Sequence, residues 1–228
     1  MEKVKRIISF FDGFNELFKT HTGNENEEIV LNEINEFLSI NIEDIIYAIQ
    51  IREEVLLDSS SIPIFSNFKD CTDNICYALD ALDNDGASMI QMGKYLRQTE
   101  IGKDMAFYKY GETHSKASTL LGLTTIRSLG DKKVFLSNIG YFYLRNKELQ
   151  NKLLTRLLLH TKIIQNIIKN CSFEEYEITQ SMSFLSDKTI NRRLSNVKKF
   201  VFKLEESNEY NFSEIIKNVN FAYKEIGD

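Results

Sequence analysis

The feature that most constrains the fold of this chain is its lack of residues that form tight turns. The 228 residues include a single proline, Pro63, and only ten glycines. A β-sandwich or β-barrel needs many turns, and glycine and proline are the residues that form them most readily. The sequence therefore predicts a mainly α-helical protein, and its 43% hydrophobic and 27% charged residues are ordinary for a globular domain.

Apolar residues recur at helical spacing over the first 60 residues, which predicts helices at about 3–19, 27–39 and 42–57. The segment LDSSSIP, Leu57–Pro63, is the strongest boundary in the chain because three serines and the proline interrupt the pattern. We therefore expect a helical N-terminal domain over residues 1–60.

Charge is distributed unevenly along the chain, whose net charge is −5. Residues 1–60 carry five basic and thirteen acidic side chains, a net charge of −8, whereas the rest carries 23 basic and 20 acidic side chains, a net charge of +3. A nucleic acid responds to local charge, so any DNA contact is expected after residue 60.

Residues 62–145 have the pattern of a winged helix, a helix-turn-helix followed by a β-hairpin. Helices are predicted at about 68–83, 89–96 and 107–123, and two strands flank a turn with the sequence GDKK at 130–133. In a winged helix the third helix enters the major groove and the hairpin touches the backbone or the minor groove. The first winged-helix domain is therefore assigned to residues 62–145.

Residues 146–228 repeat this order loosely. A long helix is predicted at 146–169, a short one within 172–182, a long basic one at 186–203 and a last one at 211–226. This range is interpreted as a second helix-turn-helix or winged-helix-like domain that ends in a C-terminal helix.

The helix at 186–203 carries the strongest binding signal. Ser186 is a good N-cap residue, yet Lys188, Arg192 and Arg193 occupy the early turns, where the helix dipole disfavours cations. Phosphate groups and guanine edges at the N-terminal end of the helix would instead favour these three cations, and an asparagine side chain can hydrogen-bond to adenine. The alternative is a solvated outer face of a packed helix. The DNA-binding candidates here are Ser186, Lys188, Thr189, Asn191, Arg192, Arg193, Asn196 and Lys199.

The helix at about 107–123 is a second candidate, since its hydroxyl, imidazole and lysine side chains can hydrogen-bond bases and phosphates. Two lysines at the hairpin tip suit a phosphate contact. The alternatives are a polar surface helix and a solvated turn. The candidates are Lys109, Tyr110, Thr113, His114, Ser115, Lys116 and Thr119 on the helix, and Lys132 and Lys133 on the hairpin.

The stretches FYKYGETHSKASTLLGL and KVFLSNIGYFYL resemble winged-helix domains of DNA-binding proteins associated with bacterial type II restriction systems. Those domains carry an alanine, Leu-Gly-Leu and a hairpin ending in Leu-Thr-x-x-Gly; a second module carries Ser-x-x-Thr-x-x-Arg-Arg before an aromatic residue, frequently tryptophan. The matches are Ala117, Leu121 to Leu123, Leu136 to Gly140 with Ser137 in place of threonine, and Ser186, Thr189, Arg192, Arg193 and Phe200.

The resemblance covers residues 62–206 and leaves the first 60 outside. It implies tandem winged-helix modules, double-stranded DNA as the ligand, and a role in restriction-modification or host defence.

No catalytic residue, metal ligand or cofactor is assigned from the sequence. A restriction nuclease needs clustered acids and a lysine on a strand to hold Mg²⁺, and the Asp-x-Lys match at Asp131 and Lys133 falls in the predicted hairpin turn. The acidic residues Asp80, Asp83 and Asp85 are interpreted as a solvated turn. An enzyme is thus not favoured, and a type II restriction endonuclease is the class expected if the chain is one.

Cysteine usage and hydropathy indicate a cytoplasmic protein without a membrane segment. The three cysteines include no CxxC pair, which suits reduced thiols, and no stretch approaches the roughly 18 apolar residues of a membrane span. The start of the chain has no signal-peptide pattern.

The first functional hypothesis is a sequence-specific protein that binds double-stranded DNA, as the recognition component of a restriction-modification or defence system or as a protein linked to one. Three alternatives stay open: a type II restriction endonuclease or subunit with an unrecognised active site, a transcriptional regulator, and a protein-interaction scaffold that binds no DNA. The N-terminal helices could form a homodimer or dock to a nuclease or methyltransferase subunit.

Overall fold

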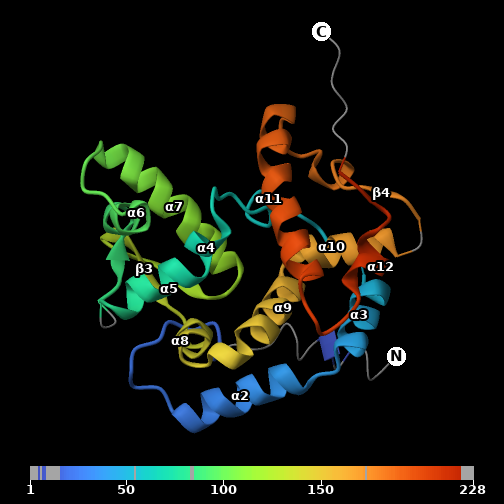
Figure 1. Ribbon diagram of the computed structural model, residues 1–228, viewed down its shortest axis with the longest axis horizontal. Helices are drawn as coiled ribbons and strands as arrows, with labels where there is room; N and C mark the ends of the chain where they lie inside the picture. Colours follow the sequence, from blue (N-terminus) through green and yellow to red (C-terminus); the bar gives the residue numbers. More distant parts are fainter. Residues whose placement is uncertain are drawn as a thin grey trace. The chain divides into compact units, whose positions relative to one another are not determined.

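The computed structural model of the chain describes residues 5, 7, 8, 16–53, 55–82, 85–172 and 174–221. It is mainly helical with a small antiparallel sheet, which confirms the predicted fold class at this level (Figure 1). Most of the helix predicted at 3–19 lies outside the described residues. Within them, no helix is long and apolar enough to cross a membrane.

The chain folds into two compact units, each built from separate stretches of sequence. The hairpin unit comprises residues 13–39 and 64–153, and the helical unit comprises residues 1–12, 40–63 and 154–228. The range 1–60 thus contributes to both units. The three domains expected from the sequence stay a prediction.

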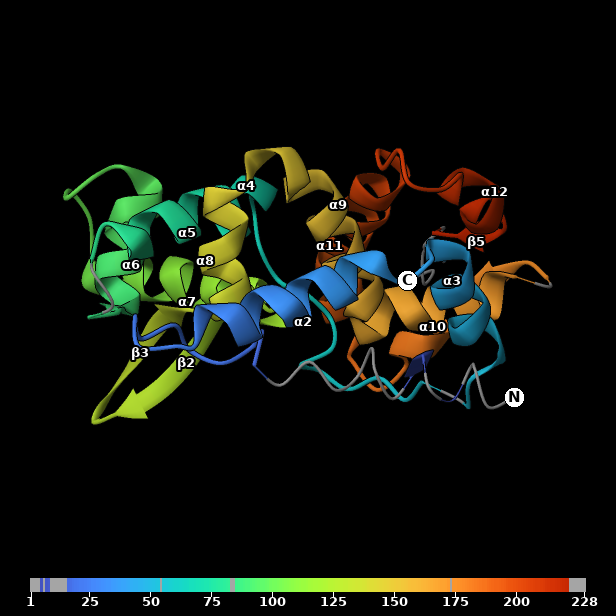
Figure 2. The ribbon, with the colours of Figure 1, turned by 90° about the horizontal axis from the view of Figure 1, so that it is seen from below.

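The hairpin unit contains a three-stranded antiparallel sheet and a set of helices. The strands pair in the order β1-β3-β2, with Ala87 opposite Val134 and Thr124 opposite Leu136. Figure 2 shows the β2–β3 hairpin projecting from the helices. In chain order the elements are α2 (Glu27–Ser39), α4 (Phe68–Cys71), α5 (Asp73–Asp80), β1 (Ala87–Ser88), α6 (Met89–Arg97), α7 (Asp104–Leu120), β2 (Thr124–Leu129), β3 (Asp131–Leu136), α8 (Asn138–Arg145) and η1 (Lys147–Leu149).

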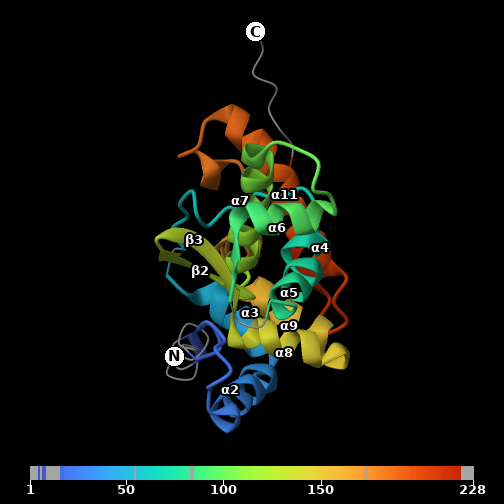
Figure 3. The ribbon, with the colours of Figure 1, turned by 90° about the vertical axis from the view of Figure 1, so that its left-hand side faces the viewer.

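Helices α6 and α7 cross in close contact because each has a glycine at the crossing. A Cβ added at Gly93 would lie 1.9 Å from the Phe107 carbonyl oxygen, and one added at Gly111 would lie 2.0 Å from that of Met89. α6 itself begins with a capping box, in which Ser88 and Gln91 satisfy each other's backbone amides. In Figure 3 the hairpin lies on one side of these two helices, and α4 and α5 lie on the other.

The predicted helix at 68–83 is interrupted, and the predicted hairpin turn is shorter than expected. The buried Thr72 separates α4 from α5, and its hydroxyl donates to the Phe68 carbonyl, a bond that competes with helix formation. At the hairpin, Leu129 pairs with Asp131 around Gly130, whose φ of 83° lies in the left-handed region that favours glycine. Lys132 and Lys133 therefore belong to β3.

The helical unit is organised around α10 (Lys162–Cys171). This helix contacts α3 (Ile42–Ile51), α11 (Asp187–Glu205) and α12 (Phe212–Ile216), and its four isoleucines are fully buried. Each contributes roughly 2 kcal/mol through burial of its side chain. The helix is thus covered on several faces, as expected of a core helix.

The prediction of a single long helix at 146–169 is wrong, because the helix is interrupted at Thr161. α9 (Gln150–His160) ends there and α10 begins after it, with Thr161 in an extended conformation. The Thr161 hydroxyl donates to the Leu158 carbonyl, and the Gln165 amide donates to the carbonyls of Leu159 and His160. These bonds satisfy carbonyls that have no partner at the end of α9.

The rest of the helical unit differs from expectation at both sides of α11. The predicted short helix at 172–182 is instead a strand, β4 (Tyr176–Glu177), and a single 3₁₀ turn, η2 (Gln180–Met182). The last predicted helix is only the short α12, followed by β5 (Val219–Asn220), which pairs with β4 in parallel. The predicted basic helix is confirmed as α11.

Candidate nucleic-acid interface

The outer face of α7 carries two exposed lysines. Lys109 and Lys116 lie two turns apart on the helix, and Lys116 pairs with Glu112 at 2.9 Å. Thr113 lies between them, and its hydroxyl donates to the Lys109 carbonyl at 3.0 Å. This face can offer two cations to a phosphate backbone, although the Glu112 carboxylate partly offsets them.

His114 and Ser115 point into the core of the hairpin unit, with exposed fractions of 1% and 0%. The His114 Nδ1 lies 2.8 Å from the Tyr110 carbonyl and acts as a donor, so Nε2 accepts from the Ser66 amide at 3.3 Å. Nε2 therefore holds the segment before α4, while Nδ1 fixes the ring against the backbone of α7 itself. This burial removes the two residues from the surface that α7 can present to DNA.

Tyr110 and Thr119 are half-buried and already hydrogen-bonded. The Tyr110 hydroxyl donates to Asp70 Oδ2 at 2.7 Å, and burial together with that bond raises the pKa of the phenol. The Thr119 hydroxyl lies 3.1 Å from that of Thr124 on β2. Both side chains thus connect α7 to neighbouring elements, which leaves Lys109, Thr113 and Lys116 as its outward-facing candidates.

The hairpin adds a group of cations that the sequence identified only in part. Lys132 is exposed, and the Lys133 ammonium donates to the Asp85 carbonyl at 3.4 Å. Arg127 on β2 is the direct cross-strand partner of Lys133, so the two side chains share one face of the hairpin. Arg127 was missed because it lies outside the GDKK turn; a basic residue on each flank of a turn is the signal for it.

On α11 the exposed polar side chains follow a single stripe. Lys188, Arg192, Ser195 and Lys199 recur at intervals of three and four residues and are all exposed, and Asn191 lies beside them. The opposite face contributes Leu194, Val197 and Phe200 to the core among other apolar residues. We refer to Lys188, Asn191, Arg192, Ser195 and Lys199 as the α11 stripe.

Two of the α11 candidates face inward. The Arg193 guanidinium donates to the Ser59 carbonyl at 2.6 Å, and burial and the neighbouring Arg192 lower its pKa. Asn196 is 3% exposed, and its amide donates to the Pro63 carbonyl at 3.4 Å. Both side chains fasten α11 to the segment LDSSSIP, and neither belongs to the exposed stripe.

The N-terminus of α11 is capped differently from the expectation. Ser186 occupies the N-cap position, but its hydroxyl makes no bond to the helix backbone and instead lies 2.9 Å from the half-buried Thr189 hydroxyl. Asp187 is the first helical residue and complements the dipole. The Asp187 carboxylate therefore offsets part of the unfavourable interaction between the helix dipole and the cations of Lys188 and Arg192.

The described residues contain no group of three or more histidine, cysteine, aspartate or glutamate side chains placed to hold a metal ion. Asp80 pairs with Arg145 at 2.9 Å, and Asp83 lies outside the described residues. The three cysteines are buried, and burial raises the pKa of Cys171 to about 12, so its thiol is protonated at neutral pH.

Comparisons of the chain with protein-family models, with curated proteins and with solved structures found no significant match.

Proposed function

We propose that this chain is a sequence-specific protein that binds double-stranded DNA, with the hairpin unit as a winged-helix module and α11 as a second DNA-contacting helix. A role as the recognition component of a restriction-modification or defence system, or as a protein linked to one, follows from the resemblance of the two motifs.

The observation that carries the proposal is the arrangement of the hairpin unit. Helix α5, strand β1, helices α6 and α7 and the β2–β3 hairpin follow one another, and the sheet order is β1-β3-β2. A winged helix combines two crossed helices with a β-hairpin beside them. In this proposal α7 is the recognition helix and the hairpin is the wing.

The charges agree with that assignment. Lys109 and Lys116 are exposed on the outer face of α7, and Arg127 and Lys132 are exposed on the hairpin. Phosphate contacts of this kind fix the register of a protein on the duplex, whereas base contacts specify sequence. Thr113, half-buried between the two α7 lysines, is the closest candidate for a base contact.

The α11 stripe supports DNA binding from the helical unit. Its three cations and its asparagine are exposed, and an asparagine side chain can pair with the two hydrogen-bonding groups of adenine. The stripe does not depend on the hairpin unit, so its contribution can be measured separately.

The test is a binding titration of labelled duplex DNA with the whole protein. Lys109→Ala with Lys116→Ala should weaken binding about thirtyfold, because two lost phosphate contacts of about 1 kcal/mol each sum to about 2 kcal/mol. Lys147→Ala with Lys162→Ala is the matched control, since both are exposed lysines on elements other than α7, the hairpin and α11. Equal affinity of the two double variants would contradict the assignment of α7.

The same protein incubated with plasmid and Mg²⁺ separates recognition from cleavage. We expect the plasmid to stay intact. Discrete fragments would instead identify a restriction endonuclease.

A further inference from the structure

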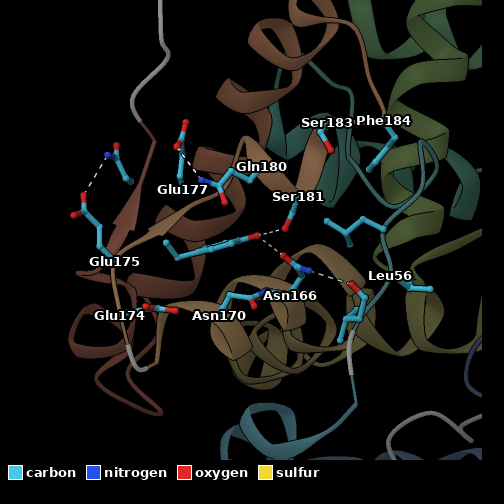
Figure 4. Close-up of a pocket in the computed structure, with 14 residues that line it drawn as sticks. Leu56, Asn166, Asn170, Glu174, Glu175, Glu177, Gln180, Ser181, Ser183 and Phe184 are labelled. Atoms are coloured by element: carbon cyan, nitrogen blue, oxygen red, sulfur yellow. Dashed lines mark hydrogen bonds between the residues drawn. The ribbon is translucent and has the colours of Figure 1, made fainter.

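The helical unit contains an open pocket of about 750 Å³ that the proposed DNA contacts do not use. Its walls come from β4, η2, α10 and the segment after α3 (Figure 4). Among the described residues that line the pocket, amide, hydroxyl and carboxylate groups dominate, and none is a lysine, arginine or histidine. A pocket of this composition disfavours anions and is suited to a cation.

The floor of the pocket is held by hydrogen bonds between buried and half-buried groups. The Tyr176 hydroxyl lies between Asn166 Oδ1, at 2.5 Å, and the hydroxyl of Ser181. The Asn166 amide donates to the Val55 carbonyl at 3.1 Å, which joins two walls. Burial raises the pKa of Tyr176, so the phenol stays neutral. The floor is therefore polar, uncharged and formed before any ligand binds.

The two ends of the pocket differ in chemistry. Figure 4 shows Glu174 and Glu175 at one end and Phe184 and Leu56 at the other, with Ser181 and Asn166 between them. The Asn220 amide donates to Glu175 Oε1 at 3.3 Å and orients that carboxylate. Phe184 and Leu56 are large apolar side chains with exposed fractions of 47% and 73%.

We propose that this pocket binds a small amphipathic organic cation, a primary ammonium group on an apolar body. The ammonium lies at Glu174 and Glu175, where charge-assisted hydrogen bonds to carboxylates are strong. The apolar body lies against Phe184 and Leu56, whose exposed surface it removes from water. The amides and hydroxyls between the two ends exclude a wholly apolar ligand, since such a ligand would leave them without water.

Isothermal titration of the whole protein with hexylammonium tests this proposal, with hexanoate as the anionic probe of matched length. We expect hexylammonium to bind with one-to-one stoichiometry in the millimolar range or tighter, of order 1 mM, and hexanoate not to bind. Absence of saturation with hexylammonium at about ten times that concentration, or equal binding of hexanoate, overturns the proposal.

Substitutions at each end of the pocket test where the ammonium group and the apolar body of the ligand bind. Glu174→Gln with Glu175→Gln should weaken hexylammonium binding at least about tenfold, whereas Glu36→Gln with Glu148→Gln, two exposed glutamates outside the pocket, should leave it unchanged. Phe184→Ala should remove the preference for hexylammonium over methylammonium. Binding that is indifferent to the pocket substitutions, with unchanged thermal unfolding, contradicts the site. The outcome does not depend on whether the chain binds DNA.

Discussion

Gly111 on α7 lies so close to Met89 on α6 that no side chain fits between them. A Cβ at Gly111 would lie 2.0 Å from the Met89 carbonyl oxygen, well inside van der Waals contact. Gly93 has the reciprocal relationship with Phe107, so the crossing of the two helices is set by two backbone contacts. The position of α7, and of its outer face, depends on this crossing.

Gly111→Ala should therefore destabilise the protein by about 1–3 kcal/mol, since the helices must separate to accommodate the methyl group. Helix propensity alone predicts the opposite, a gain of about 1 kcal/mol. Urea unfolding measures the change in the free energy of unfolding. Ala106→Gly on the exposed face of the same helix gives the size of the effect of helix propensity alone. Equal or greater stability of Gly111→Ala would contradict the close crossing.

His114→Ala should lower the free energy of unfolding by about 2–4 kcal/mol, because it leaves the Ser66 amide and the Tyr110 carbonyl without their side-chain partner. Lys109→Ala on the same helix should change it by no more than about 0.5 kcal/mol. Chemical denaturation of both variants checks the contrast. If His114→Ala were as stable as Lys109→Ala, the structural role of His114 would be wrong.

On α11, substitutions of the exposed and inward-facing residues should separate binding from stability. Lys188→Ala, Arg192→Ala and Lys199→Ala together should weaken DNA binding at least about tenfold while changing unfolding little. Arg193→Ala should instead cost about 1–3 kcal/mol of stability, because the Ser59 carbonyl loses its donor. Binding titrations and thermal unfolding on the same samples test both expectations. Unchanged stability of Arg193→Ala would refute the structural role of Arg193, and unchanged DNA binding of the triple variant would refute the role of the α11 stripe.

Much of the architecture was predictable from local patterns. The bounds of α2 agree with the predicted 27–39, and α6, α7, the hairpin and α11 were all expected. The helices are visible in the sequence as short stretches of apolar periodicity, and the hairpin is visible from its turn residue Gly130. The breaks at Thr72 and Thr161 were missed, because side-chain bonds to carbonyls of the preceding turn interrupt helices whose apolar pattern continues.

The candidate site was less predictable, because orientation on a helix depends on partners far away in sequence. His114 and Tyr110 read as surface residues of a recognition helix, yet they bind Ser66 and Asp70, which lie 48 and 40 positions earlier. Arg193 and Asn196 likewise face the segment that ends at Pro63. A single sequence gives charge and spacing but not these distant partners.

Salt dependence tests the electrostatic part of the proposed function. If about six phosphates are neutralised, the logarithm of the association constant should fall with the logarithm of salt concentration at a slope near −5. Removal of three cations from the α11 stripe should reduce the slope by about 3. A binding constant that does not change between low and physiological salt would exclude a phosphate-based interface.

A sequence-specific protein must prefer one duplex sequence over others of the same length and charge. The most direct measurement selects duplexes from a random library with the whole protein, then titrates the selected duplex and a scrambled duplex at one physiological salt concentration. We expect the selected duplex to bind at least about 10³-fold more tightly than the scrambled one. Equal affinity for the two duplexes, or no binding to either, would contradict sequence-specific recognition.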